Sequence, residues 1–379
     1  MRMLFCVLTA FLAAFHAYLT VYINSTVALN NGGPWAISSI FVVSAVVALF
    51  AFYNAPRMLA RLGNRRFITL FSLLGIAALV VLAISHNPIA ILIALGIHVA
   101  EAPLIGYSLD IFFEYAVRRE GATGVARGLF LTAGNTALVL SPLIAGIVLD
   151  HAESSAVYGL AAAFLFVFWS LCMFCSRNFK DPEYRKTNLH GLLKTARGHL
   201  GPVIAAQFWL RLFYGWAPVY LPLYLTTILG FTWSQTGFIL AIALLPFVLF
   251  ELPLGRLEDG LLGEREILAL GFIILSFSII GLWLVPWHSL IATTVILFLS
   301  RTGAAMIEIA TETNFFRSVS AENADAIVLF RMMQPLGWIA GVTVAAVTIL
   351  LIPFPYAFGV LGAIVLLGLI PTMRIEDSK

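Results

Sequence analysis

Charged side chains are scarce in this sequence, since only 11% of its 379 residues are Asp, Glu, Lys or Arg. Roughly a quarter of the residues in an ordinary soluble domain are charged. Hydrophobic residues make up 61% of the chain, and their runs recur from one end to the other. A soluble domain with a single anchor is therefore excluded. The runs continue for about 18 residues or more, which favours membrane-spanning helices over the short strands of a barrel.

Cysteines and enzyme motifs are also scarce. The chain has three cysteines, and Cys172 and Cys175 form a lone C-x-x-C without further ligands nearby, so we expect no metal site. The sequence lacks G-x-x-x-x-G-K-[ST], D-D-x-x-D and H-E-x-x-H. We expect no enzyme activity, no catalytic residues, no cofactor and no nucleic-acid partner. A membrane-embedded enzyme and a non-transporting sensor remain the alternative functions.

The apolar runs predict an all-α polytopic membrane protein with about twelve helices of about 20 residues each. The predicted spans are 3–29, 35–59, 67–85, 88–117, 125–149, 155–176, 202–228, 234–254, 266–286, 288–316, 324–350 and 353–372. Turn-forming residues such as Asn31-Gly32-Gly33-Pro34 and His86-Asn87-Pro88 separate neighbouring spans. The polar stretch 177–200 divides the chain into two six-helix bundles, 1–176 and 201–379.

Positive charge indicates the orientation. Of the 22 Lys and Arg residues, Arg211, Arg301 and Arg331 fall deep within predicted spans, and Arg57 and Arg127 lie two residues inside the ends of spans. Every other one lies in alternate loops, in the central stretch or at the termini, which is the bias of cytoplasmic segments. We therefore expect both termini in the cytoplasm, in the plasma (inner) membrane, and a monomer surrounded by the lipid bilayer.

A loop pattern occurs after the second span of each half. Gly255-Arg256-Leu257-Glu258-Asp259-Gly260 and Gly263-Glu264-Arg265 form the second copy, and Arg61-Leu62-Gly63-Asn64-Arg65-Arg66 matches the later part of the first. With the twelve-span plan, the pattern resembles the G-x-L-x-D-R-x-G-R-R loop of the major facilitator superfamily. Ala60 stands where that family has an acidic residue.

The resemblance implies two pseudo-symmetric bundles and a cytoplasmic gate that locks them by ion pairs. Loop arginines would approach carboxylates at the inner ends of nearby helices. Arg331 would either extend to the membrane surface or pair with Glu258 or Asp259 of the motif. The candidate gate residues are Arg61, Arg65, Asp110, Glu114, Gly255, Asp259, Arg265, Glu308, Glu312 and Arg331. The alternative is a solvated cluster of salt bridges that contributes little.

Five ionisable residues fall near mid-membrane when depth is counted at about 1.5 Å per residue. They are His16, His98, Glu101, Arg211 and Arg301. A charge at that depth costs roughly 2.5–3.5 kcal/mol to insert, so each is a functional candidate. They belong to the first, fourth, seventh and tenth spans, which line the central cavity in the family that the chain resembles.

We therefore expect a secondary transporter that works by alternating access. Glu101 is the candidate proton carrier, because a carboxyl at that depth can bind and release protons near neutral pH. Arg211 and Arg301 would hold a small anionic or zwitterionic organic solute. His16, His98, Gln207, Tyr214 and Asn135 would complete the site. The alternatives are sodium coupling, a structural pair between Glu101 and an arginine, and histidines that only join helices.

Overall fold

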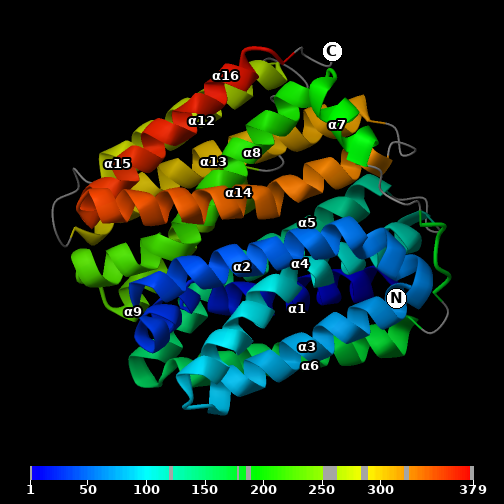
Figure 1. Cartoon of the computed structure of the whole chain (residues 1–379), viewed down its shortest axis with the longest axis horizontal. Helices are drawn as coiled ribbons and strands as arrows, with labels where there is room; N and C mark the ends of the chain where they lie inside the picture. Colours follow the sequence, from blue (N-terminus) through cyan, green and yellow to red (C-terminus); the bar gives the residue numbers. More distant parts are fainter. Residues whose placement is uncertain are drawn as a thin grey trace. The chain divides into compact units, whose positions relative to one another are not determined.

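The computed structural model describes residues 2–118, 123–176, 179–184, 189–250, 263–282, 289–319 and 324–375 (Figure 1). Within these ranges the chain is helical and has no strand. Eight helical segments of the described residues are long and apolar enough to cross a membrane, with Leu4–Leu62 counted as one segment. The prediction of an all-α, multi-pass membrane protein is therefore confirmed, whereas the count of twelve spans stays a prediction.

The first half of the chain is built from long helices. They are α1 (Arg2–Val21), α2 (Asn24–Leu62), α3 (Asn64–Ile84), α4 (Pro88–Arg118), α5 (Thr123–His151) and α6 (Ser154–Cys175). Gly33 breaks α2 with φ of 74° and ψ of −175°, a backbone conformation that is essentially open to glycine alone. The predicted turn at Asn31-Gly32-Gly33-Pro34 is therefore a sharp break between two helical segments.

The predicted span 3–29 is not one continuous helix. Tyr22 and Ile23 form a turn between α1 and α2, in which the Ile23 N–H donates to the Thr20 carbonyl at 2.9 Å. The segment around this turn contains several β-branched residues, which lose side-chain freedom in a helix. The interruption falls inside the span, where irregular backbone is tolerated only if protein or a water-filled cavity surrounds it.

The second half contains shorter pieces. They are α7 (Leu189–Arg197), α8 (Gly201–Leu223), a π-helical turn (Tyr224–Ile228), α9 (Trp233–Leu244), α10 (Pro246–Leu249), α12 (Glu264–Gly281), α13 (Leu290–Ser318), α14 (Ala324–Leu351), α15 (Phe354–Val365), a 3₁₀ turn (Leu366–Gly368) and α16 (Leu369–Thr372). Helix α7 lies in the stretch that we predicted only as a linker. It buries Leu192 and exposes Lys194 and Arg197, so it is amphipathic.

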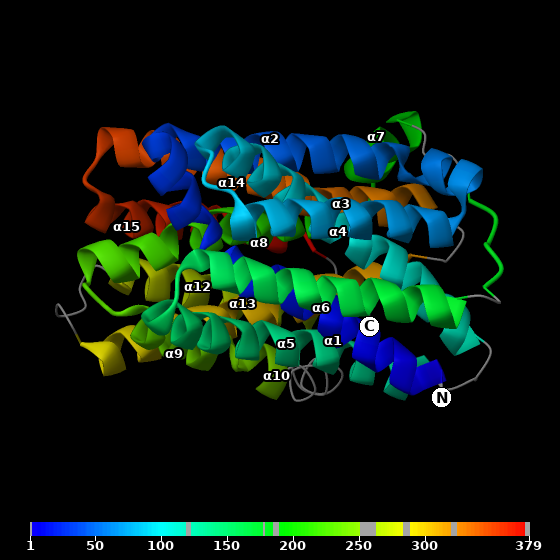
Figure 2. The same cartoon turned by 90° about the horizontal axis from the view of Figure 1, so that it is seen from below.

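Contacts divide the chain into two compact units. The first unit comprises Met1–Lys186 and Thr232–Ala241, and the second comprises Thr187–Phe231 and Ile242–Lys379. In the first, α3 packs on α4 and α6, and α1 packs on α5. Figures 1 and 2 both show α3 beside α6. In the second, α12 packs on α13 and α15, and α8 packs on α14, which repeats the same scheme.

Helix α9 contributes to the first unit through a close contact with α5. A Cβ atom on Gly146 would lie 2.5 Å from the Trp233 carbonyl oxygen and 3.2 Å from the Gly237 Cα atom. The Ser234 N–H also donates to Asp150 Oδ2 at 3.2 Å. Small residues let helix backbones approach this closely, which is a common basis of packing between membrane helices.

Candidate functional site

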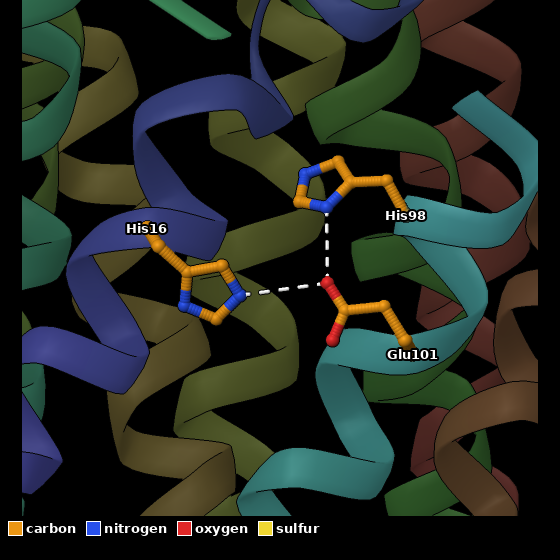
Figure 3. Close-up of side chains that lie close together, drawn as sticks. All are labelled: His16, His98 and Glu101. Atoms are coloured by element: carbon orange, nitrogen blue, oxygen red, sulfur yellow. Dashed lines mark hydrogen bonds and ion pairs between the residues drawn. The ribbon is translucent and has the colours of Figure 1, made fainter. Parts of the chain in front are cut away.

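Three titratable side chains meet inside the first unit (Figure 3). His98 Nδ1 lies 3.1 Å from Glu101 Oε1, and His16 Nε2 lies 3.6 Å from the same oxygen. Each of the three side chains is at most 2% exposed. His98 and Glu101 are three residues apart on α4 and therefore share a face, whereas His16 comes from α1. We call His16, His98 and Glu101 the triad.

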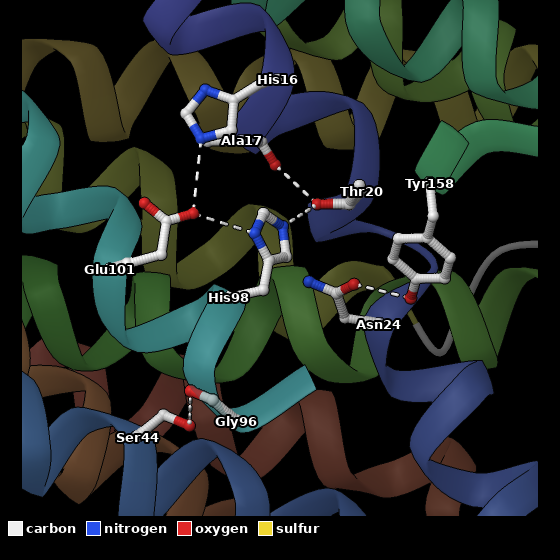
Figure 4. A network of polar contacts seen from close by, with 9 residues as sticks. All are labelled: His16, Ala17, Thr20, Asn24, Ser44, Gly96, His98, Glu101 and Tyr158. Atoms are coloured by element: carbon white, nitrogen blue, oxygen red, sulfur yellow. Dashed lines mark hydrogen bonds and ion pairs between the residues drawn. The ribbon is translucent and has the colours of Figure 1, made fainter. Parts of the chain in front are cut away.

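Thr20 fixes the tautomer of His98 (Figure 4). Its hydroxyl donates to the Ala17 carbonyl at 3.0 Å and lies 2.7 Å from His98 Nε2. Because a hydroxyl has one proton, His98 must donate its Nε2–H to Thr20. The contact between His98 Nδ1 and Glu101 Oε1 then contains one proton, carried either by an imidazolium or by a carboxylic acid.

Gly75 of α3 and Pro103 of α4 also shape the surroundings of the triad. A Cβ atom on Gly75 of α3 would lie 2.7 Å from Glu101 Oε1 and 2.8 Å from its Cδ, so the glycine leaves room for the carboxyl group. Pro103 lies within α4, two residues after Glu101. It has no N–H for the carbonyl of Val99, so the helix loses a hydrogen bond next to the triad.

The turn between α1 and α2 lies beside the triad and is held by buried polar contacts. Thr20 is the last residue but one of α1, and Asn24 is the first residue of α2. Asn24 Oδ1 accepts a hydrogen bond from the Tyr158 hydroxyl at 2.9 Å, and both side chains are buried (Figure 4). These contacts connect the helix break on one side to His98 and on the other to α6.

A second polar cluster lies inside the second unit around Arg211 of α8. Arg211 Nη2 donates to Glu308 Oε1 at 2.8 Å, and the Tyr214 hydroxyl donates to Glu308 Oε2 at 3.0 Å. Because a guanidinium has donors only, the amide oxygen of Gln207 must face it, accepting from Nε at 3.0 Å and Nη2 at 2.9 Å. The Gln207 amide nitrogen then donates to Thr311 Oγ1 at 3.0 Å. These five residues form the arginine cluster.

Arg301 of α13 is also buried in the second unit, with 3% of its surface exposed. Its guanidinium lies 4.8 Å from the centroid of the Phe213 ring, a distance at which a cation is attracted to the face of an aromatic ring. Phe213 follows Arg211 by two residues on α8. Arg301 is therefore held beside the helix that carries the arginine cluster.

Glu308 changes the charge balance that we predicted. The sequence predicts two mid-membrane arginines against the one carboxylate of Glu101 and places Glu308 in the gate. In the structure Glu308 pairs with Arg211, because the two residues reach the same depth from facing helices, α13 and α8. Within the second unit, the arginine cluster thus combines the carboxylate of Glu308 with the guanidinium of Arg211, and Arg301 is a second guanidinium beside the same helix α8.

The remaining candidates are less closely grouped. Asn135 is half-buried on α5, Arg61 is exposed, and Arg65 Nη2 donates to the Met173 carbonyl at 3.1 Å. Arg265 forms an ion pair with Glu266 at 3.3 Å, and Arg331 forms one with Glu312 at 3.6 Å. Asp110 is half-buried on α4. Gly255, Asp259 and the side chain of Glu114 lie outside the described residues.

Asp181 is a functional candidate that the sequence analysis missed. Its Oδ1 accepts from the Asn64 N–H at 2.7 Å and from the Tyr184 hydroxyl at 2.7 Å. The carboxylate therefore caps the N-terminus of α3, where negative charge is favourable. Burial, together with the hydrogen bond to Asp181, raises the pKa of Tyr184. The central segment thus supplies an acidic group to the first loop, in which Ala60 replaces the acidic residue of the motif.

The comparisons with known proteins agree on one fold. Residues 203–378 match the model of the Major Facilitator Superfamily. The nucleoside transporter NupG is similar over 100% of both chains, with a TM-score of 0.78 and 12% identity. A POT family transporter in complex with a thioalcohol-conjugated peptide is similar over 98% of this chain and 94% of its own, with a TM-score of 0.80 and 13% identity. No curated protein is a significant match to the sequence.

The family model covers the C-terminal half, and the fold of the solved transporters covers the whole chain. The loop pattern at Gly255 through Arg265 lies within the matched residues. The helical architecture described above agrees with both findings. The C-terminal half of the chain therefore resembles the Major Facilitator Superfamily in sequence, and the whole chain has the fold of the solved transporters.

Proposed function

We propose that the protein is a secondary transporter that moves a small organic solute bearing a carboxylate, anionic or zwitterionic, by alternating access with proton coupling. The fold supports transport, because the similar structures are named as transporters of nucleosides and peptides. The observation that carries the choice of solute is the arginine cluster, whose Arg211–Glu308 ion pair is partly buried, together with the buried Arg301 on the facing helix α13.

The arginine cluster supports a carboxylate-bearing solute. A guanidinium binds a carboxylate through two parallel hydrogen bonds, which are strong where water is excluded. Arg211 donates one hydrogen bond to Glu308, so a solute carboxylate would compete with Glu308 for this guanidinium. A zwitterion would then give Glu308 an ammonium group as its new partner, which keeps every charge paired.

The triad supports proton coupling. Glu101 shares one proton with His98, and both groups are shielded from water. In this proposal Glu101 releases and regains that proton as the solute is moved. Ionisable residues inside membrane spans commonly form relays of this kind in pumps and transporters.

The proposal also includes the topology. We place about twelve spans in two six-helix bundles in the plasma membrane, with both termini in the cytoplasm. The repeated packing of the two units and the one-sided distribution of Lys and Arg support this arrangement.

Solute binding can be found first and transport tested second. Purified protein is screened by thermal unfolding against amino acids, peptides, nucleosides and organic acids, because a ligand that binds the folded state raises its unfolding temperature. A compound that stabilises the protein is then tested for uptake into proteoliposomes with and without an inward proton gradient. We expect gradient-dependent uptake of a carboxylate-bearing compound, which Glu101→Gln abolishes while solute exchange persists.

Arg301→Gln tests the proposed class of solute, and Lys180→Gln is its control. Arg301→Gln should weaken binding of the carboxylate compound by at least tenfold, because each charge-assisted hydrogen bond contributes about 1.5–3 kcal/mol. Lys180→Gln, which removes an exposed charge from the central segment, should leave binding unchanged. Uptake restricted to neutral compounds, with equal affinity in both variants, would contradict the proposed solute class.

A further inference from the structure

Several buried polar atoms of the triad have no hydrogen-bond partner. Neither ring nitrogen of His16 has a hydrogen-bond partner, and neither does Glu101 Oε2. All of these atoms are buried, and buried polar groups without partners are rare because they cost free energy. The proton between His98 and Glu101 satisfies only one of the two histidines that approach Oε1.

The three side chains have the chemistry of a transition-metal site. Two imidazoles and one carboxylate bind Zn²⁺ in hydrolases, and the same set binds iron in oxygenases. Ca²⁺ and Mg²⁺ prefer oxygen ligands alone, so the two histidines disfavour them. One ligand atom from each residue lies within 4.8 Å of the other two.

The distances fit such an ion. With metal–ligand bonds of about 2.0–2.1 Å, neighbouring ligands of a tetrahedral ion lie about 3.3 Å apart. The two contacts to Glu101 Oε1, at 3.1 Å and 3.6 Å, lie on either side of this value. Figure 3 shows both rings directing a nitrogen toward that oxygen.

The surroundings of His98 also suit a metal ligand. A ligating histidine usually donates its second ring N–H to a neighbouring acceptor, which orients the ring. His98 does so through Nε2, toward Thr20 Oγ1 at 2.7 Å, and this leaves the Nδ1 lone pair for an ion. Gly75 leaves the space that the carboxyl group of Glu101 occupies.

We propose that His16, His98 and Glu101 bind a divalent transition-metal ion of the Zn²⁺ and Co²⁺ class. The ion would replace the proton between His98 and Glu101 and would at the same time give His16 a partner. This inference rests on the triad alone. Because the ion and the coupling proton would occupy the same atoms, the proposed proton coupling belongs to the metal-free protein.

Co²⁺ is the probe, because its visible absorption reports the ligand geometry. The full-length protein is purified with a tag that contains no histidine, treated with a chelator, and equilibrated overnight with Co²⁺, since the triad is buried. We expect one Co²⁺ per chain, with absorption bands of a four- or five-coordinate ion that Zn²⁺ removes by competition.

Variants locate the ion. His16→Asn and Glu101→Gln should each weaken Co²⁺ binding by at least about tenfold. Loss of a residue that only orients a metal ligand already weakens binding by about 10–100-fold, and these variants remove a ligand itself. His151→Asn, which removes an exposed histidine on α5, should bind as the parent does. Thr20→Val keeps all three ligands and should weaken binding by about 10–100-fold.

Circular dichroism and gel filtration verify that each variant is folded. If His16→Asn or Glu101→Gln does not fold, the Co²⁺ affinity of Thr20→Val tests the proposal. The proposal is overturned if the parent binds no Co²⁺, or if the folded triad variants keep the parent's affinity. Uptake of solute by metal-free parent protein is measured in parallel, so that failure of the metal site leaves the transport proposal standing.

Discussion

Gly75 shows how one residue can determine the position of a buried carboxyl group. It lies on α3, whereas Glu101 lies on α4, and the absent Cβ is replaced by the carboxyl group itself. Leu165 of α6 occupies the remaining side at 2.8 Å from the same point. A side chain at this position must therefore displace either the triad or the packing of α6.

We expect Gly75→Ala to destabilise the protein by about 1–3 kcal/mol, the usual cost of overpacking. The measurement is thermal unfolding in detergent. Gly106→Ala on α4 is the matched control, because nothing lies within 4 Å of its added Cβ. A helix gains from Gly→Ala in the absence of contacts, so the control should be neutral or slightly stabilising. Equal unfolding temperatures for the two variants would contradict the assigned position of Glu101.

The pair of Arg211 and Glu308 can be tested by a double-mutant cycle. Arg211→Gln and Glu308→Gln should each lower stability by on the order of 2 kcal/mol, less than the 3–5 kcal/mol of a fully buried pair, because Glu308 is 29% exposed. The double variant should recover part of the loss, since neither charge is left without its partner. Additive losses in the double variant would argue against a direct interaction.

Among the elements, the break in α2 depends on backbone conformation alone. Nothing lies within 4 Å of a Cβ atom added to Gly33, but its φ of 74° excludes other residues. Gly33→Ala should therefore cost about 1–3 kcal/mol without any steric contact. Gly134→Ala on α5, which also has open space but a helical backbone, serves as the control in the same unfolding assay. A neutral Gly33→Ala variant would mean that the segment adopts another turn.

The sequence predicted the position of the candidate residues along their helices better than it predicted which side chains they contact. Depth follows from counting along a helix, which placed His16, His98 and Glu101 near one level. Partners depend on which helices face one another, and the sequence does not contain that information directly. The sequence analysis gave an arginine as the alternative partner of Glu101, whereas the structure brings His16 and His98 to its carboxylate.

Local chemistry explains the other differences. The turn at Tyr22 and Ile23 was missed because hydrophobicity continues through it, and Gly75 was missed because a glycine has no side chain to signal a role. The missed cap at α3 comes from Asp181, which is 117 positions away from Asn64 along the chain. The turn at Gly33 was predictable from the sequence, because Gly-Gly-Pro is a strong local signal for a turn.

At the scale of the molecule, the orientation of the chain can be tested with single cysteines. Cys6, Cys172 and Cys175 are first replaced, and His86→Cys and Lys194→Cys are then made separately at exposed positions. A membrane-impermeant maleimide added to intact cells should label His86→Cys and should reach Lys194→Cys only after the membrane is opened. The opposite pattern would reverse the proposed orientation, and labelling of both would contradict the count of spans between them.

The contact between α5 and α9 has a consequence for biosynthesis. The first unit contains residues 232–241, which leave the ribosome after the central segment and α8 have been made. Domains generally fold from the N-terminus as they are synthesised. The surface of α5 around Gly146 therefore stays exposed to lipid or to a chaperone until α9 is inserted and Gly237 packs against it. A nascent chain that ends at Lys186 already contains the triad, but the first unit becomes complete only when translation has passed Ala241.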